Sequence, residues 1–273
     1  MDFNRYRHRN HGEQRSPRCA RFVWIMALAS GCAFIARPAH ADNPGYDRPG
    51  YGFTPAVLAA GDVTIEQGLP DWSRDRDDGV SSSLYSADSL IRIGVGGPLE
   101  LQLGSSPWNS LRQAGVGIDR RSHGRGDSNL ALKLALPSSS KTFTWGLLGS
   151  VEFTDGARDF HNDRRQYLLG AQFNLQANQR NSLGAYLEDV RSGHSDSTTV
   201  ALSDNYTLTP TLTAYAETAL LHSPDQGSGT VAGAGLAWMT SPRVQFDAGL
   251  DHRLGGNTSE WMANLGVSVY FGH

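Results

Sequence analysis

Cysteine is nearly absent from this chain of 273 residues. Its only two cysteines, Cys19 and Cys32, lie close to the N-terminus, inside a segment with the features of a secretion signal. Once that segment is removed, the chain carries no thiol. Disulfide bonds, cysteine-ligated metals and cysteine nucleophiles are therefore excluded from the mature part.

Long apolar runs are also missing. After residue 41 no segment reaches the ~18 consecutive apolar residues that indicate a transmembrane helix, and the mean hydropathy is mildly negative. This excludes a bundle of membrane helices. It does not exclude a membrane β-barrel, because lipid-facing and lumen-facing residues average out along each strand.

Basic residues are scarce in the mature part. Seven of the 24 Lys and Arg residues but only two of the 27 acidic residues lie in residues 1–41. From Asp42 onward, 17 basic residues therefore accompany 25 acidic ones, which gives a net charge of −8. A surface with this excess of negative charge repels the phosphate backbone of nucleic acids, so we expect no nucleic-acid partner.

The N-terminus has the order of a signal peptide. An arginine-rich start is followed by the 14-residue apolar run Phe22–Ile35 and by the small-residue site Ala39-His40-Ala41. The run is too short to span a bilayer, so we predict a signal peptide over residues 1–41, cleaved after Ala41. A competing interpretation uses Leu28–Cys32, which resembles a lipoprotein box with one residue too many.

Alternation of apolar and polar residues dominates the rest of the chain. In Arg243–Leu254, for example, Val244, Phe246, Ala248 and Leu250 alternate with polar or small residues. Such a strand has one apolar and one polar face, as between lipid and a water-filled lumen. We expect twelve strands, near Ala60–Gln67, Ser83–Val95, Leu99–Ser105, Ser128–Leu136, Thr142–Phe153, Arg165–Gln176, Ser182–Arg191, Thr198–Leu208, Thr211–His222, Thr230–Met239, Arg243–Leu254 and Glu260–Phe271.

The connections between these strands alternate in kind. Short turns such as Gly96-Gly97-Pro98 and Thr209-Pro210 alternate with more polar and mostly longer loops. The predicted loops are Gly68–Ser82, Ser106–Asp127, Thr154–Arg164, Ser192–Ser197, Ser223–Gly229 and Gly255–Ser259. An up-and-down outer-membrane barrel has this asymmetry, with tight periplasmic turns and longer external loops.

The predicted fold is all-β: a transmembrane antiparallel up-and-down β-barrel of about twelve strands over residues 59–273. Residues 42–58 are rich in Pro, Gly and Tyr, and we expect an irregular lead that lies against one barrel mouth. Aromatic residues near strand ends fit interfacial girdles. These are Trp145, Tyr167, Tyr206, Trp238, Trp261 and Phe271. A soluble β-sandwich is the alternative, because it too has alternating strands.

Three segments resemble a known family. Gly126–Leu136 has Gly-Asp followed by apolar alternation with a Lys, Leu212–Glu217 has a strand with a central Glu, and Gln245–Gly249 with Leu265–Phe271 is similar to a closing hairpin. These resemble strands of the outer-membrane transporter family named for the MetA pathway of phenol degradation. The resemblance implies a barrel and a transport role, and its name is no evidence for a phenolic solute.

If the apolar faces of the strands contact lipid, the charged residues on the opposite faces lie in the lumen. A charged side chain there costs less free energy than one in hydrocarbon. The lumen-lining residues predicted in this way are Glu66, Asp88, Arg92, Glu100, Lys133, Glu152, Glu188, Glu217, Asp247 and Asp251. Either they line an aqueous path whose negative potential favours cations or polar neutral solutes, or they pair across the lumen and fill it. A barrel of twelve strands lies between barrels of about eight strands, which side chains fill, and barrels of about 16 to 18 strands, which hold open channels.

Other chemistries have weaker support. No Gly-x-Ser-x-Gly elbow is present, so we expect no enzyme, although a lipid-modifying barrel with Ser and His on its wall stays an alternative. The acidic run Asp71–Asp78 is interleaved with arginines and predicts a solvated loop rather than a metal site. We expect no metal and no cofactor.

The sequence therefore predicts an outer-membrane channel for passive passage of small molecules of unspecified kind. A plugged structural or adhesive barrel is the second hypothesis. The expected partners are outer-membrane lipid, a small-molecule solute and the barrel assembly machinery, which reads a terminal aromatic residue. Here Phe271 is followed by Gly272 and His273, a departure from that pattern.

Overall fold

The structure, a computed structural model, describes residues 43–77, 79–193 and 196–272. The predicted signal peptide lies outside these residues. Within the described ranges, no helix is long and apolar enough to cross a membrane.

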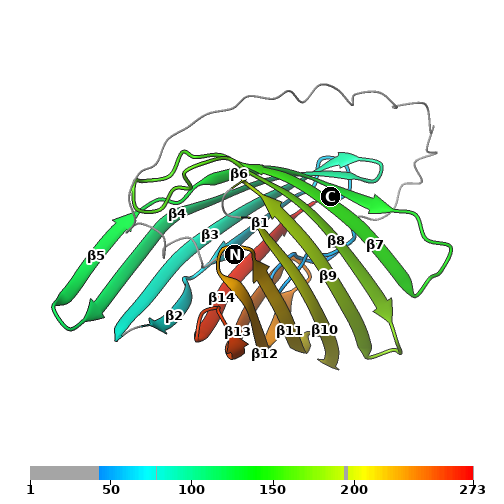
Figure 1. Cartoon of the computed structure of the whole chain (residues 1–273). Helices are drawn as coiled ribbons and strands as arrows, with labels where there is room; N and C mark the ends of the chain where they lie inside the picture. Colours follow the sequence, from blue (N-terminus) through cyan, green and yellow to red (C-terminus); the bar gives the residue numbers. More distant parts are fainter. Residues whose placement is uncertain (1–42, 78, 194–195, 273) are drawn as a thin grey trace.

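Fourteen antiparallel strands form one closed sheet (Figure 1). They are β1 (Val63–Gly68), β2 (Asp71–Asp77), β3 (Val80–Gly96), β4 (Leu99–Gly115), β5 (Ile118–Gly124), β6 (Ser128–Leu136), β7 (Phe143–Glu152), β8 (Gln166–Gln176), β9 (Asn181–Arg191), β10 (Ser197–Thr209), β11 (Leu212–Ser223), β12 (Gly227–Ser241), β13 (Val244–Gly256) and β14 (Trp261–Phe271).

These strands make a barrel with twelve positions around its wall. β1 and β2 both pair with β3 and β14, so together they fill one position. In the same way β5 and β6 both pair with β4. The pairing of β1 with β14 closes the ring. The prediction of a twelve-stranded, up-and-down antiparallel barrel is therefore confirmed.

Two of the predicted loops are wrong. Gly68–Ser82 contains β2 and the start of β3, and Ser106–Asp127 contains the second half of β4 and all of β5. The four strands β2 to β5 form a sheet that extends beyond the rest of the barrel, at the left of Figure 1. The acidic run that begins at Asp71 is thus an edge of this extension and not a solvated loop.

The barrel has two different ends. At the turn end, short turns join β3 to β4, β8 to β9, β10 to β11 and β12 to β13, and the last strand finishes there at Phe271. At the loop end, residues 153–165 fold over the inner face of the extension. Phe160 packs there in a buried cluster with Leu84 and Leu111.

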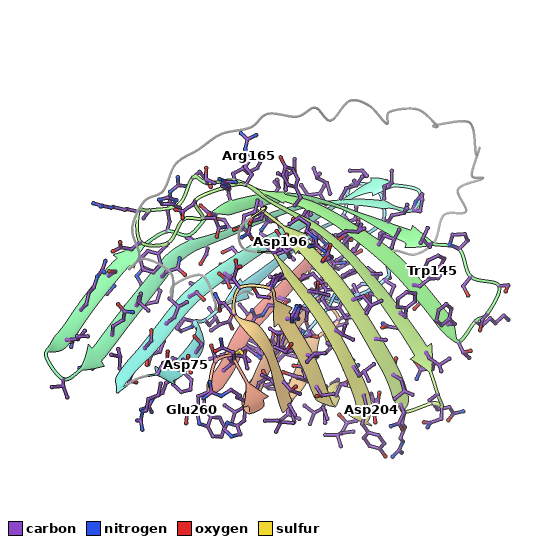
Figure 2. The ribbon with its side chains drawn as sticks, viewed as in Figure 1. Asp75, Trp145, Arg165, Asp196, Asp204 and Glu260 are labelled. Carbon is purple, nitrogen blue, oxygen red and sulfur yellow. The ribbon has the colours of Figure 1, made fainter. Side chains whose placement is uncertain are left out.

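The exterior is apolar. Leu132, Leu187, Leu202 and Leu250 point outward and are 47 to 56% exposed, because nothing in the chain covers them. Exposed aromatic residues lie toward both ends of the strands, among them Tyr167, Trp238 and Phe271, together with two that the sequence interpretation missed, Tyr85 and Trp108. One carboxylate, Asp204, labelled in Figure 2, also lies on the outer face near the turn end, where Asn181 Nδ2 donates to it over 3.2 Å.

Candidate functional site: the lumen and its N-terminal lead

Residues 43–58, the lead, lie inside the barrel. The chain enters at the turn end, where Tyr46 Oη donates a hydrogen bond to Arg243 O over 2.7 Å, and leaves there, where Gly61 N donates to Gly94 O over 2.9 Å. Between these points the lead contacts side chains from strands all around the wall. The sequence interpretation placed it against one mouth; the structure places it across the lumen.

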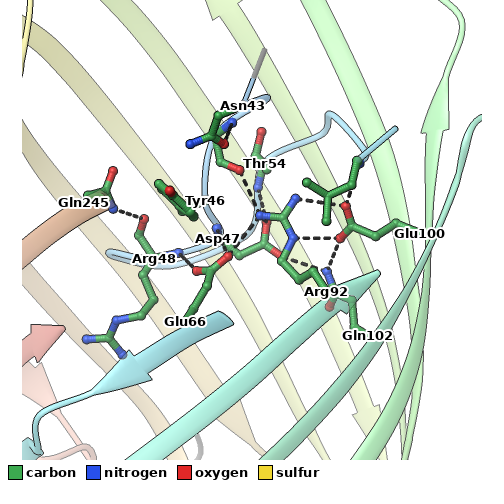
Figure 3. Close-up of polar contacts among 12 residues, drawn as sticks. Asn43, Tyr46, Asp47, Arg48, Thr54, Glu66, Arg92, Glu100, Gln102 and Gln245 are labelled. Atoms are coloured by element: carbon green, nitrogen blue, oxygen red, sulfur yellow. Dashed lines mark hydrogen bonds and ion pairs between the residues drawn. The ribbon is translucent and has the colours of Figure 1, made fainter. Parts of the chain in front are cut away.

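An ion-pair network at the turn end fixes the lead, and Figure 3 labels four of its members, Asp47, Glu66, Arg92 and Glu100. Arg92 of β3 donates from Nε and Nη2 to the two carboxylate oxygens of Glu100 over 2.8 and 3.0 Å. Its Nη1 donates to Glu66 Oε1 over 3.0 Å and to Gly45 O of the lead over 2.9 Å. The side chains of Arg92, Glu66 and Glu100 have no exposed surface, so each charge depends on its partner.

Asp47 of the lead completes this network. Its carboxylate lies 3.1 Å from Lys133 Nζ, 3.5 Å from Arg92 Nη1 and 2.8 Å from Gln102 Nε2. Lys133 is also 2.9 Å from Glu100 Oε1. Two cations and three carboxylates therefore share one buried cluster, which we call the turn-end network: Asp47, Glu66, Arg92, Glu100 and Lys133. The lead supplies one of its five members.

Arg48 anchors the lead to β2 and β13. Its Nη1 and Nη2 donate to the two oxygens of Asp71 over 3.0 and 2.9 Å, and Nη2 also donates to Asp247 Oδ1 over 3.2 Å. Its backbone N–H donates to Glu66 Oε2 over 2.8 Å, and its carbonyl accepts from Gln245 Nε2 over 3.0 Å. A bidentate pair of this kind fixes direction as well as distance.

The tip of the lead, residues 50–53, reaches farthest into the barrel. Tyr51 N donates to Glu217 Oε2 over 2.8 Å, and Phe53 packs edge-on against Tyr186 with ring centroids 6.0 Å apart. Gly50 has φ +86°, and a Cβ there would lie 2.7 Å from Glu217 Oε2. Only a glycine lets the backbone approach that carboxylate in this conformation.

Three cavities border the lead. One of about 390 Å³ is lined by Asp88, Glu152 and Phe160, one of about 200 Å³ by Tyr186, Glu188 and His222, and one of about 250 Å³ by Glu217, Asp251 and Asn264. Arg48, Gly50 or Gly52 of the lead contributes to the lining of each. The lead thus forms the floor of polar cavities that extend toward the loop end.

The 250 Å³ cavity contains unpaired oxygens. Among the described residues, Asp88 Oδ2, Glu217 Oε1, Asp251 Oδ1 and Asn264 Oδ1 are buried without a hydrogen-bond partner, and all four residues line this cavity. Buried polar atoms normally have partners. Water or a polar solute in the cavity would satisfy these oxygens, and their charge favours a cation.

The structure separates the ten predicted lumen residues into two groups. Glu66, Arg92, Glu100 and Lys133 come together in the turn-end network, and Asp247 joins Arg48. Asp88, Glu152, Glu188, Glu217 and Asp251 line the cavities instead. Asp47 and Arg48 were not predicted as site residues, because the lead has no strand period that could assign them a side.

A Ser-His contact also occurs on the wall. His222 Nδ1 lies 2.9 Å from Ser228 Oγ, between β11 and β12 at the loop end, and both residues are exposed. Among the described residues, no carboxylate or amide side chain contacts the other nitrogen of His222. A hydrolytic triad needs a third group that orients the histidine, so this pair is not assembled as one.

Solved structures share this fold. The COG4313 outer membrane channel from Pseudomonas putida F1 is 12% identical with a TM-score of 0.64, over 79% of this chain and 97% of that one. The KdgM porin in complex with disordered oligogalacturonate is 11% identical with a TM-score of 0.51, over 77% of this chain and 99% of that one. No curated protein matches the chain by sequence.

A closed barrel with an apolar exterior and a polar interior is the architecture of outer-membrane proteins, and the similar solved structures are an outer membrane channel and a porin. The predictions of the fold and of an outer-membrane location are confirmed. The profile described as "Putative MetA-pathway of phenol degradation" matches residues 46–271, which is most of the sequence. The chain therefore belongs to this family of outer-membrane barrels, as its strand motifs indicated.

Proposed function

We propose that the protein is a passive outer-membrane channel for small polar solutes, with a preference for cations. The observation that carries this proposal is the set of buried oxygens that line the 250 Å³ cavity without partners, three of them from carboxylates. A pathway lined by one sign of charge concentrates ions of the opposite sign and rejects those of the same sign.

The lead sets the size of solute that can pass. It crosses a barrel whose strand number lies between the filled and the open classes, and it leaves cavities of only about 200 to 390 Å³ around itself. Solutes therefore pass beside the lead or when it is displaced. The process needs no cofactor and no chemical step, and we propose no catalytic role for the His222–Ser228 pair.

The cation preference is tested by reversal potentials in planar bilayers under a KCl gradient. We expect discrete conductance steps and a reversal potential on the cation-selective side for the wild type. Asp251→Asn should move that potential toward zero. Asp189→Asn is the matched control, because it removes the same charge from an exposed residue that pairs with Arg191 outside the lumen.

Two results would contradict the proposal. If the wild type were anion-selective, the carboxylates would not determine the ion selectivity. A correctly folded protein that never conducts would favour the plugged structural barrel, in which the lead closes the lumen permanently. Folding is checked separately by the change in electrophoretic mobility on heating. A sample that does not conduct because it is unfolded is therefore not counted as evidence.

A further inference from the structure

Three arginines lie in one row on the extended sheet. Arg74 of β2 is opposite Ser83 of β3, Ser83 is opposite Arg112 of β4, and Arg112 is opposite Arg121 of β5. Residues directly opposite each other in antiparallel strands project from the same face of the sheet. Arg74, Arg112 and Arg121, which we call the arginine row, therefore share one face.

That face points away from the lumen. The neighbouring positions Leu84 and Leu111 pack with Phe160 in a buried cluster on the inner face, and Ser73 and Ser122 are also buried. Because successive residues of a strand point to opposite faces, the arginines beside them point outward. The Arg112 side chain is 56% exposed.

The row begins at the height where the apolar exterior ends. Trp261, directly opposite Arg74, is the first residue of β14, and the exposed Phe271 is the last. Ten residues of a strand tilted by about 40° cover about 25 Å along the barrel axis, which is the height of the apolar band of such barrels. Tyr85 and Trp108 lie nearer the turn end than the row and are exposed.

The charges of the row lack compensation. Among the described residues, neither Arg74 nor Arg121 forms an ion pair, and Arg112 Nε has only the exposed Asp119 at 3.7 Å. Arg112 and Arg121 are directly opposite each other, and like charges in that position repel. By contrast Arg120, the next residue on β5, points to the other face and lies 3.3 Å from Asp159.

We propose that the arginine row binds the phosphate groups of anionic lipids in the membrane leaflet at the loop end. Guanidinium groups pair with phosphate through two parallel N–H donors. A phosphate between Arg112 and Arg121 would remove their repulsion, and the Ser83 hydroxyl lies between Arg74 and Arg112 to donate a further hydrogen bond. The aromatic residues below the row hold the barrel at the depth this requires.

The test compares barrels in phosphatidylcholine vesicles with and without lipid A, a glycolipid that carries two phosphates. We expect lipid A to raise the unfolding temperature of the wild type, and high salt to reduce this rise. Arg112→Ala with Arg121→Ala should weaken the apparent affinity for lipid A roughly 30-fold. Arg112→Lys with Arg121→Lys should restore part of it. Arg120→Ala is the matched control and should bind as the wild type does.

Three outcomes overturn the proposal. In the first, the Arg112→Ala, Arg121→Ala double variant responds to lipid A as strongly as the wild type. In the second, the control Arg120→Ala loses the response equally. In the third, free inorganic phosphate gives the same stabilisation as lipid A, which would mean that the row binds a soluble anion rather than a lipid. The channel readouts do not enter this test, so the two proposals can fail separately.

Discussion

The two halves of the lumen use their charges in opposite ways. At the turn end, every charged group of the network has a partner within about 3 Å, and the side chains of Arg92, Glu66, Glu100 and Lys133 have no exposed surface. Toward the loop end, carboxylate oxygens of Asp88, Glu217 and Asp251 stay unpaired beside a cavity. The first half is built as a core, whereas the second leaves carboxylates beside a cavity.

This contrast shows how a barrel of intermediate size combines two roles. A lumen of twelve strands lies between those that side chains fill and those that stay open. Here the lead supplies the missing volume at one end and brings its own charges, Asp47 and Arg48, to match those of the wall. The remaining carboxylates line the cavities beside the lead.

The largest expected effect comes from breaking the turn-end network. Arg92→Met would leave Glu66 and Glu100 buried with less compensation, and removal of one partner from a buried ion pair typically costs 3–5 kcal/mol. We expect a loss of this size in the free energy of unfolding, measured by denaturant titration of the detergent-folded barrel. Arg180→Met, in an exposed turn, should change it by less than about 0.5 kcal/mol. A loss below about 1 kcal/mol for Arg92→Met would mean that the network is only a surface-like ion cluster.

The second effect tests the assignment of the two wall faces. Leu187→Lys places a charge on the lipid face near the middle of β9, which should cost about 2–4 kcal/mol. Insertion into vesicles should fall accordingly, as measured by the fraction with heat-modifiable mobility. Glu188→Lys, on the next residue, faces the lumen and should insert well, with loss of the 2.6 Å bond from Tyr186 Oη. Equal behaviour of the two variants would show that the faces are assigned wrongly.

The third effect concerns Arg48, which anchors the lead inside the barrel. Arg48→Ala removes three charge-assisted hydrogen bonds to Asp71 and Asp247, and a net loss of about 2 kcal/mol is typical for bonds of this kind. The ratio of docked to undocked lead should then fall about 30-fold. Single-channel records should show more frequent and larger openings, with Arg48→Lys intermediate and Arg180→Ala, in an exposed turn, unchanged. Records identical to wild type would mean that the lead does not control conduction.

Alternation along single strands was sufficient to predict most of the fold. β6 to β14 each keep an apolar outer face, so their positions could be read from period-two patterns with errors of a few residues. β2 and β5 were missed because both of their faces are polar. In β2, Trp72 and Arg74 lie on the outer face while Asp71 and Ser73 lie inside, and no apolar period marks that strand.

The candidate site was predicted only in part, for a related reason. The wall residues carry the strand period, so their side could be assigned, but pairing across the lumen joins residues far apart in the sequence. Whether Glu100 meets a cation or faces a cavity depends on where the lead lies. The lead has no periodicity, and its Pro and Gly residues indicate only that it is irregular.

The smallest expected effect belongs to the loop that covers the extension. Asp155 accepts hydrogen bonds from Ser128 N over 2.8 Å and Ser128 Oγ over 2.9 Å, and it pairs with Arg125. Donation by the Ser128 backbone N–H is the main cause that lowers the pKa of this carboxyl. A lowered pKa stabilises the folded loop above the unfolded value of about 4, and this contribution decreases below that pH until it is lost as the pH falls through the lowered pKa of the folded state. Because Asp155 is exposed, we expect less than about 1 kcal/mol. Hydrogen exchange of residues 153–165 should be faster in Asp155→Asn than in the wild type at pH 7, and this difference should shrink as the pH falls below about 4, whereas Asp163→Asn should exchange as the wild type does throughout. A difference that stays the same at all pH values would show that the amide disturbs the loop through its shape, and the order of the loop would then depend on the packing of Phe160 rather than on charge.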